Sequence, residues 1–446
     1  MILPFMKTTK KHKESNMSKI IAGIDFGTSN TAASIIDTTG VARMVELEQG
    51  RYTMPSAMFF DADSKQVYYG TDAEKQNALS PTTGRMMRAV KSILGTDLMS
   101  GKTGVVGKMM SYLDIIRDFL LEIKLSIDIQ AQTNVDSVVL GRPVHFTHPA
   151  NIEEDLQAEK ALRKIAQSLG FKNIAFQYEP IAAAFTYEQG LLPDQEKLAL
   201  IVDIGGGTSD FSVIKLSGAR KNDLNRHQDI LANTGIRIGG KDFDEALSKH
   251  IFMPLFGRGG QYEEGGKRKP LPTAPYDNLS SWNKIKDLYD KKTLDQVHKY
   301  INIECQPRCL HRLCEIIENK LGHIHLAYVE QTKINLSSND TTNATLDYIN
   351  DRPSLSVTRS NFETCISTDV KNIQDTMLQC VHDANVSPCN IDLIILTGGS
   401  SQIPYIINMV RHLFPNAEIS STDTMTSVGM GLAYDALRHY QSNKWD

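Results

Sequence analysis

Two stretches of the chain consist almost entirely of apolar residues, and in each a short polar turn interrupts the run. They cover residues 20–37 and 198–216. Each pattern predicts a buried strand that ends in an aspartate, Asp25 or Asp203, then a tight turn and a second buried strand. The turns are Gly27-Thr28-Ser29-Asn30 and Gly205-Gly206-Gly207-Thr208-Ser209. Because strand, aspartate, glycine turn and strand occur twice in the same order, the sequence predicts a duplicated unit.

The segments around these hairpins alternate between helical and strand-like patterns. Apolar residues at helical spacing predict helices over 80–94, 109–129, 152–169, 181–189, 240–250, 301–333, 360–386 and 426–438. Short apolar runs predict strands within 41–60 and over 135–140, 174–177 and 393–396. Residues 256–297 are rich in glycine, proline and basic residues, and we interpret them as a long surface insertion with helical pieces. Strands that alternate with helices in two halves indicate an α/β architecture.

Composition narrows the class of protein. Of the 446 residues, 41% are hydrophobic and 22% are charged, which is typical of a soluble globular protein long enough for two lobes. A formal net charge of −4 gives no basic surface for nucleic acid, and no apolar run reaches the roughly 20 residues that a membrane span needs. We expect a disordered tail at residues 1–18. All six cysteines lie between positions 305 and 389, which favours a reducing cytoplasm over a secreted disulfide framework.

The two turns have the chemistry of a phosphate site. Glycines lack a Cβ atom, so Gly205, Gly206 and Gly207 allow backbone N–H groups to approach an anion closely. A carboxylate at the end of the preceding strand suits such a cradle when a hydrated Mg²⁺ lies between carboxylate and phosphate. If the two hairpins face each other, Asp25 and Asp203 lie on opposite sides of one polyphosphate, in a nucleotide cleft between two lobes. The alternative is a glycine-rich hairpin in which the aspartate has no ligand.

Five motifs in a fixed order give the chain a family resemblance. They are IDFGTSN at 24–30, YEPIAAA at 178–184, DIGGGTSD at 203–210, GGKDFD at 239–244 and LTGGSSQIP at 396–404. In this order they resemble the ATPase domain of DnaK-type heat-shock chaperones, in the actin/hexokinase superfamily. The long insertion makes the chain most similar to the YegD branch. The resemblance implies a two-lobed α/β fold with duplicated ribonuclease-H-like units and a nucleotide cleft between the lobes.

The resemblance also implies boundaries for the lobes. Residues 19–196 would form lobe I, and residues 197–395 would form lobe II with an insertion at about 256–300. Residues 396–446 would return to lobe I and end in a C-terminal helix. We expect no peptide-binding domain of the kind that complete chaperones of this family carry. Assistance to protein folding would then come from nucleotide-driven lobe closure together with a client protein or co-chaperone.

Site residues carry over from the matched motifs. Asp25 and Asp203 would hold Mg²⁺ through water, and Lys91 would contact the γ-phosphate of ATP and the attacking water, with Glu179 nearby. Positioning and charge neutralisation of this kind are what phosphoryl transfer requires, so we expect slow Mg²⁺-dependent hydrolysis of ATP to ADP, with K⁺ as a candidate second ion. Thr208 joins the catalytic set with Lys91, Glu179 and Asp203. The residues expected to bind nucleotide are Gly27, Thr28, Ser29, Asn30, Gly205, Gly206, Gly207, Asp210, Gly239, Gly240, Gly398, Gly399 and Ser400.

The resemblance extends to an adenosine-binding helix. Glu330, Lys333 and Ser337 match its polar positions, and their spacing places all three on one face, within reach of ribose and base. The chain departs from the family at Ile334 and Gln402, which stand where arginines often stack on adenine. A charged helix face without a ligand is the alternative.

Other functions stay open at this point. Ile334 and Gln402 favour a nucleotide-binding switch or scaffold that does not hydrolyse ATP, whereas Lys91, Glu179 and Asp203 favour the ATPase. A small-molecule kinase of the same superfamily would need a catalytic aspartate in its first lobe, and we find no such motif.

Several residues also have plain structural interpretations. Lys91 falls in the last turn of the helix predicted over 80–94, before Gly95, where a cation is favourable against the helix dipole. Cysteines at 305, 309 and 314 with His311 are a candidate metal site, but they follow a helical pattern that is atypical of structural zinc. We expect His323 and His325 at a helix surface.

Overall fold

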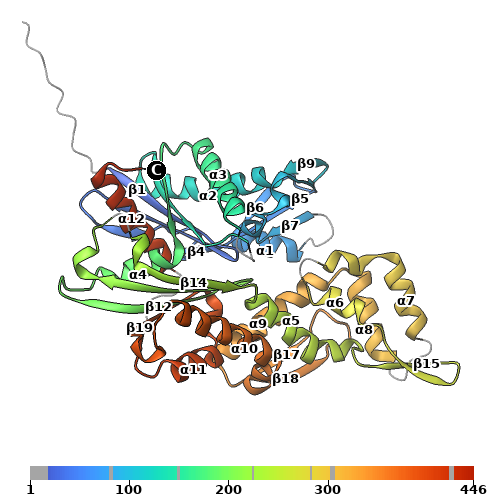
Figure 1. Ribbon diagram of the computed structural model, residues 1–446. Helices are drawn as coiled ribbons and strands as arrows, with labels where there is room; N and C mark the ends of the chain where they lie inside the picture. The colour runs from blue at the N-terminus through green and yellow to red at the C-terminus, as the bar shows by residue number, and fades with distance from the viewer. Residues whose placement is uncertain are drawn as a thin grey trace, which may run out of the picture.

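Two large β-sheets organise the chain in the computed structural model, which describes residues 19–79, 84–147, 151–223, 226–281, 284–301, 307–420 and 426–445 (Figure 1). The first sheet runs in the order β11 (Asn173–Tyr178), β10 (Ser137–Arg142), β1 (Ile20–Phe26), β2 (Asn30–Asp37) and β3 (Ala42–Met44), and β4 (Thr53–Pro55) also pairs with β2. The second runs in the order β14 (Ile230–Ile236), β13 (Ser209–Ser217), β12 (Glu196–Ile204), β19 (Leu393–Thr397) and β20 (Glu418–Ser420). The tail expected at 1–18 lies outside the described residues.

The two predicted hairpins form the centre of these sheets. Strands β1 and β2 pair antiparallel, as do β12 and β13. A parallel strand lies beside the first strand of each hairpin, β10 beside β1 and β19 beside β12. An antiparallel strand lies beside the second, β4 beside β2 and β14 beside β13. The two sheets therefore repeat one arrangement, and the predicted α/β fold is confirmed.

Helices cover both faces of the first sheet. On one face, α2 (Tyr112–Ala131) and α3 (Ile152–Ser168) share a core with Leu140 of β10. On the other face, α4 (Glu179–Glu188) and α12 (Ser427–Ser442) pack against Val139, the preceding residue of the same strand. Successive side chains of a strand point to opposite faces, so a buried strand with helices on both sides reads as a continuous apolar run. The last helix thus returns from the far end of the sequence to the first sheet.

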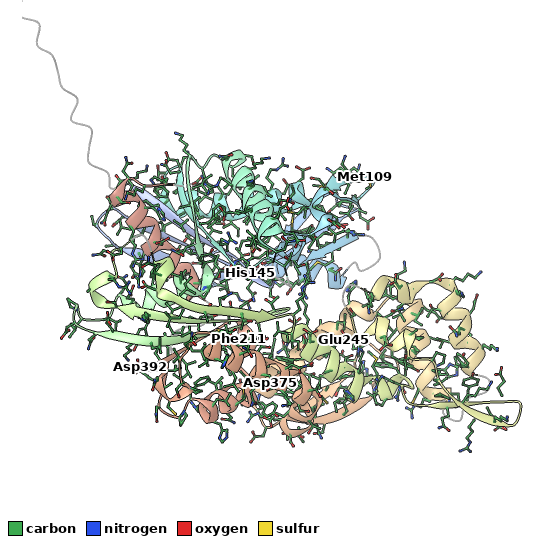
Figure 2. All side chains as sticks on the ribbon, in the orientation of Figure 1. Met109, His145, Phe211, Glu245, Asp375 and Asp392 are labelled. Carbon is green, nitrogen blue, oxygen red and sulfur yellow. The ribbon has the colours of Figure 1, made fainter. Side chains whose placement is uncertain are left out.

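The second sheet packs against a larger set of helices. They are α5 (Gly240–Leu247), α8 (Pro307–Glu318), α9 (Gly322–Ser338), α10 (Arg359–Asp383) and α11 (Pro404–Leu413). Phe211 of β13, labelled in Figure 2, is fully buried in this core, and its carbonyl accepts a hydrogen bond from Cys380 of α10. The helix predicted over 301–333 is two helices, α8 and α9. The hairpin of β17 (Thr341–Thr345) and β18 (Ser354–Thr358) was not predicted, because its residues are mostly polar and small.

The helix predicted over 80–94 is wrong. A third sheet occupies this region, with β5 (Ala57–Asp61) between β6 (Val67–Tyr69) and β7 (Gly84–Arg88), and α1 (Gly70–Leu79) packs against it. Ala89 then adopts a left-handed conformation, with φ of 55°, and one 3₁₀ turn, Val90–Ile93, follows. Met86 and Met87 fit a helical spacing, but they lie on opposite faces of a strand that pairs with β5. A two-stranded sheet of β8 (Lys102–Val105) and β9 (Lys108–Ser111) then leads into α2, so the helix predicted from 109 begins at Tyr112.

Residues 256–297, predicted as a surface insertion, are partly buried. Their elements are the hairpin β15 (Gln261–Glu264) and β16 (Lys267–Pro270), then α6 (Ala274–Leu279) and the start of α7 (Lys291–Ile301). The basic strand β16 is exposed, but Tyr276, Leu279 and Leu288 are buried in the core of the second sheet. Apolar residues hidden among prolines and glycines therefore anchor this segment to the protein.

His325 is also buried, against the expectation of a surface position. Its ring lies edge-on against Phe252 and Phe256, and its Nδ1 is 2.8 Å from the Tyr348 hydroxyl. Burial lowers the pKa of His325 to about 3, so the ring is neutral and serves as a polar core residue.

Gly431→Ala should destabilise the fold because α12 and α4 touch at the backbone. A Cβ atom at Gly431 would come 1.7 Å from the carbonyl oxygen of Ala182. Although alanine favours a helix by about 1 kcal/mol over glycine, we expect a net loss of about 1–3 kcal/mol in the free energy of unfolding, measured by urea denaturation. Gly429→Ala is the control, because its Cβ would lie 3.2 Å from the flexible end of Met44. Equal stability of the two variants would contradict this account of the packing.

Candidate functional site

The two glycine turns lie against each other. Residues 27–29 connect β1 to β2, and residues 205–208 connect β12 to β13. A Cβ atom built on Gly206 would lie only 2.0 Å from the Ser29 hydroxyl oxygen. The approach of the two turns therefore depends on glycine at position 206. The structure brings together two segments whose sequences resemble each other but lie far apart in the chain.

Lys91 and Glu179 form an ion pair beside these turns. The Lys91 Nζ atom lies 2.5 Å from the Glu179 Oε1 atom, and the side chains are 8% and 13% exposed. Glu179 is the first residue of α4, where the positive end of the helix dipole favours a carboxylate. Lys91 lies in the 3₁₀ turn after Ala89 and not in the last turn of a helix, so the helix dipole does not account for its position.

Asp25 and Asp203 lie close enough to this ion pair to be affected by it. Burial, together with the charges of Glu179 and Asp203, raises the pKa of Asp25 to about 8, and Lys91 opposes the increase. Burial also raises the pKa of Asp203 to about 7, together with Asp210 and Glu179. Burial alone would lower the pKa of Lys91, but Glu179 and Asp25 outweigh it and the pKa is raised. The cluster thus holds more carboxylates than one lysine can neutralise.

This donor set fits Mg²⁺. Mg²⁺ binds carboxylate oxygens, keeps several waters, and is usually held by one or two protein carboxylates together with phosphates. A cation near Asp25 and Asp203 would favour their ionised forms, against the burial and the carboxylate repulsion that raise both pKa values. Within the described ranges, no three or more histidine, cysteine, aspartate or glutamate side chains are arranged to hold a metal ion directly.

The second glycine turn rests on two neighbouring segments. The Gly240 and Lys241 amides donate to the Gly205 and Gly206 carbonyl oxygens, at 2.9 and 2.8 Å. The Ser400 hydroxyl also donates to the Gly205 carbonyl, at 3.2 Å. A Cβ atom on Gly398 would lie 2.6 Å from the Asp203 Oδ1 atom, and one on Gly239 would lie 2.6 Å from the Gly207 nitrogen. The motifs at 203–210, 239–244 and 396–404 therefore meet at one place.

Helix α9 contributes a further charged group. The Lys333 Nζ atom donates to the Asp244 carboxylate at 2.8 Å and to the Gly240 carbonyl at 3.1 Å. Burial raises the pKa of Asp244 to about 6, with Lys333 opposing the effect. Ser337 donates its hydroxyl to the Lys333 carbonyl within the helix. Ile334 is 51% exposed, so it presents an apolar surface to solvent beside these groups.

Arg88 connects two parts of the protein and was missed by the sequence analysis. It contacts Glu74 of α1, and its Nη1 atom lies 3.8 Å from the Glu330 Oε2 atom of α9. Burial lowers the pKa of Arg88, and Glu330 and Asp244 oppose this. Arg88 ends β7, within the segment that was wrongly predicted as a helix, and no local pattern indicated this contact. Asp244 lies in a quoted motif, but its contact with Lys333 joins residues far apart in sequence.

The remaining predicted residues are placed as follows. The Gly205 amide donates to the Thr208 carbonyl at 2.9 Å, and the carbonyl of Asn30 closes the first turn over Gly27, 2.1 Å from a Cβ built there. Thr28 lies in that turn, Gly399 begins the 3₁₀ turn Gly399–Gln402, and Gln402 is exposed. The candidate metal-binding cysteines are not brought to this site. Cys309 and Cys314 lie on α8 and form no disulfide, and residue 305 is outside the described residues.

Comparisons with known proteins agree with this arrangement. A family model described as Hsp70 protein matches residues 21–259 and 298–439. The chain is also similar to a chaperone protein HscA homolog of Shewanella denitrificans, with 24% identity over 442 residues. The match covers 94% of this chain and 58% of the relative, so the chain spans less than two thirds of that protein's length. Among the described residues, no helix combines the length and apolar character that crossing a membrane requires.

Asp25→Asn should stabilise the protein, and the gain should grow with pH. The carboxyl has its ordinary pKa of 3.8 in the unfolded chain and about 8 in the folded protein. Below about pH 4 both states hold the proton, so the substitution changes little. As the pH rises toward 8, only the unfolded state ionises, which penalises folding of the native protein but not of the variant. We expect the difference in free energy of unfolding, measured by urea denaturation in EDTA, to rise from pH 4 to pH 8.

Asp37→Asn is the control with the opposite sign. The Thr39 hydroxyl and the Val41 amide donate hydrogen bonds that lower the pKa of Asp37. Its ionised form therefore contributes stability above its ordinary pKa that is lost as the pH falls. This variant should lose stability at pH 7 and little at pH 3. A pH-independent difference for Asp25→Asn would refute the buried, proton-binding carboxyl.

Proposed function

Because the chain belongs to the Hsp70 protein family, we propose that it binds ATP and hydrolyses it slowly with Mg²⁺, as part of a chaperone that assists protein folding. The ATPase domain of this family has an actin-like fold, which the chain shares. Closure of the two lobes around nucleotide would be the functional motion. The placement in the YegD branch is part of the proposal, and residues 260–297, outside the family match, support it.

The observation that carries the proposal is the buried Lys91–Glu179 pair, whose charges act on both Asp25 and Asp203. When bound, Mg²⁺ would supply charge neutralisation for the phosphates. Asp25 and Asp203 would hold it through water, and the ammonium of Lys91 would contact the terminal phosphate. Glu179 keeps Lys91 protonated and positioned, because it lowers the energy of the charged form. Electrostatic stabilisation by preorganised groups is the main requirement of phosphoryl transfer.

The other predicted residues fit roles along the nucleotide. Thr208 and Asp210, with the amides of the two turns, would line the phosphates. Lys333 would contact the ribose, because its ammonium is already directed by Asp244 and the Gly240 carbonyl and has a third hydrogen to donate. Ile334 would give adenine an aliphatic surface.

Chaperone activity rests on the likeness to a protein named as a chaperone. That relative is longer than this chain, so its activity and partners are transferred only as a proposal. We propose lobe I at 19–196, lobe II at 197–395 and a return to lobe I from 396, with a client protein or co-chaperone as partner. The five described cysteines form no disulfide, which suits a cytoplasmic location.

A nucleotide-dependent switch without hydrolysis is the second candidate. The exposed Ile334 favours it, because loss of base stacking would leave binding to depend on phosphates and ribose. The two candidates differ in turnover and not in binding, so one experiment separates them.

Lys91→Ala should abolish hydrolysis while ATP still binds. We expect the single-turnover rate with Mg²⁺ and K⁺ to fall by about 100-fold or more, because the group that contacts the terminal phosphate is lost. Lys197→Ala is the control. Lys197 also forms an ion pair, with Glu418 at 2.8 Å, but it lies at the start of β12, whereas Asp203 lies near the end of that strand. If the native protein binds ATP tightly but does not hydrolyse it, the ATPase is rejected and the nucleotide-dependent switch remains. No binding of ATP at all would reject both candidates.

Arg88→Gln should accelerate the release of bound ADP. Arg88 joins β7 to α9 through Glu330, and in the proposed cleft these two elements lie on opposite sides of the nucleotide. A partly exposed ion pair contributes about 0.2–1 kcal/mol, so we expect release to be up to about fivefold faster in stopped-flow measurements with a fluorescent ADP analogue. Because salt screens such pairs, the rate of ADP release should depend more on ionic strength in the native protein than in Arg88→Gln. Arg85→Gln, on the same strand but bonded to Thr103, should leave the rate unchanged.

A further inference from the structure

Ser56 supports the first glycine turn from behind. It directly follows β4, which pairs with β2, and it is 2% exposed. Its hydroxyl donates to the Gly27 carbonyl at 2.7 Å, and its amide donates to the Ser29 carbonyl at 2.8 Å. Two carbonyls of the turn are therefore bound by one residue that the sequence analysis did not identify.

Thr31 sets the direction of this hydroxyl. The Thr31 and Ser56 hydroxyl oxygens lie 2.9 Å apart, and Thr31 is fully buried. The single hydroxyl hydrogen of Ser56 points to the Gly27 carbonyl, which can only accept. Thr31 must therefore donate to Ser56, which gives a relay from Thr31 through Ser56 to the turn.

The second sheet contains the same arrangement. Gly240 and Lys241 come shortly after β14, which pairs with β13 as β4 pairs with β2. Their amides donate to the carbonyls of Gly205 and Gly206, as Ser56 donates to those of the first turn. The Ser209 hydroxyl at the start of β13 donates to the Ile238 carbonyl at 2.7 Å. The duplicated unit thus includes, in both halves, a donor behind the turn.

Holding the carbonyls from behind has a consequence for anions. A carbonyl dipole that turned into the cleft would repel a phosphate, whereas an N–H group attracts it. Donors behind each turn satisfy its carbonyls, so these carbonyls need not turn toward an anion. The Gly205 amide bonds to the Thr208 carbonyl, and the other amides of the turns are the groups that would face the anion. We propose that Ser56, oriented by Thr31, is a positioning residue that shapes the first turn for the phosphates of a nucleotide. This inference rests on the nucleotide binding proposed above.

The test separates phosphate binding from general stability. Isothermal titration measures the affinity of the full chain for ADP with Mg²⁺ and for adenosine. For Ser56→Ala we expect an ADP affinity about five- to tenfold lower and an adenosine affinity within about twofold of the native value, as for loss of one buried hydrogen bond. Ser56→Thr keeps the hydroxyl and should restore most of the ADP affinity. Thr31→Val should show a weaker loss of the same kind, because it removes only the orienting donor.

Ser34→Ala is the matched control. Ser34 is also fully buried on β2, but its hydroxyl donates to the Gly429 carbonyl of α12 at 2.6 Å and does not contact the turn. It should lower the melting temperature without changing the ratio of ADP to adenosine affinity. If Ser56→Ala does not fold, Thr31→Val carries the same comparison.

Two sets of results would overturn the positioning role of Ser56. Equal losses for ADP and adenosine in Ser56→Ala, or no loss for ADP, would overturn the positioning role and leave nucleotide binding intact. Failure of the native protein to bind either ligand would overturn the proposed function and this inference with it.

Discussion

Three carboxylates and one lysine share a poorly hydrated space, and the site depends on how their charges balance. A buried ion pair offsets the cost of desolvation only under two conditions. Its geometry must be good, and the remaining hydrogen-bond donors and acceptors of the two groups must have partners. Lys91 and Glu179 meet the first condition at 2.5 Å, but Asp25 and Asp203 have no cation of their own beyond Lys91. Burial raises the pKa values of both aspartates, and this excess of negative charge adds to the increase. A protein that keeps such an excess is less stable without a ligand and ready to bind a cation.

The fold supplies these four groups from separate segments. Each aspartate is the last but one residue in the first strand of a central hairpin. Glu179 starts a helix beside β10, and Lys91 lies in a 3₁₀ turn after the third sheet. No single segment contains the site, so the charges come together only when the two large sheets are assembled. The duplicated topology explains why the aspartates meet, since each occupies the same place in its own sheet.

The elements that could be predicted from the sequence are those that a local apolar pattern determines. The central hairpins, α3, α4 and α10 follow apolar periods and were found with small errors in their bounds. The strand β7 was missed because Met86, Met87 and Val90 imitate a helical period, and only pairing with β5 selects the strand. Arg88 and Ser56 were missed for a related reason. Their partners, Glu330 and Gly27, lie far away in the chain, and nothing in the neighbouring residues signals a contact of that kind.

Backbone groups form one end of the proposed cleft, and long side chains form the other. At the turns, donors such as Ser56 and Gly240 form hydrogen bonds with the backbone carbonyls, so glycine and chain geometry determine the site. At α9, long side chains determine it, with Lys333 held by Asp244. A substitution at a turn changes the backbone and with it the contacts to phosphate, whereas a substitution on α9 changes one side chain. An aliphatic residue such as Ile334 can therefore alter affinity for the base while the arrangement around Lys91 remains the same.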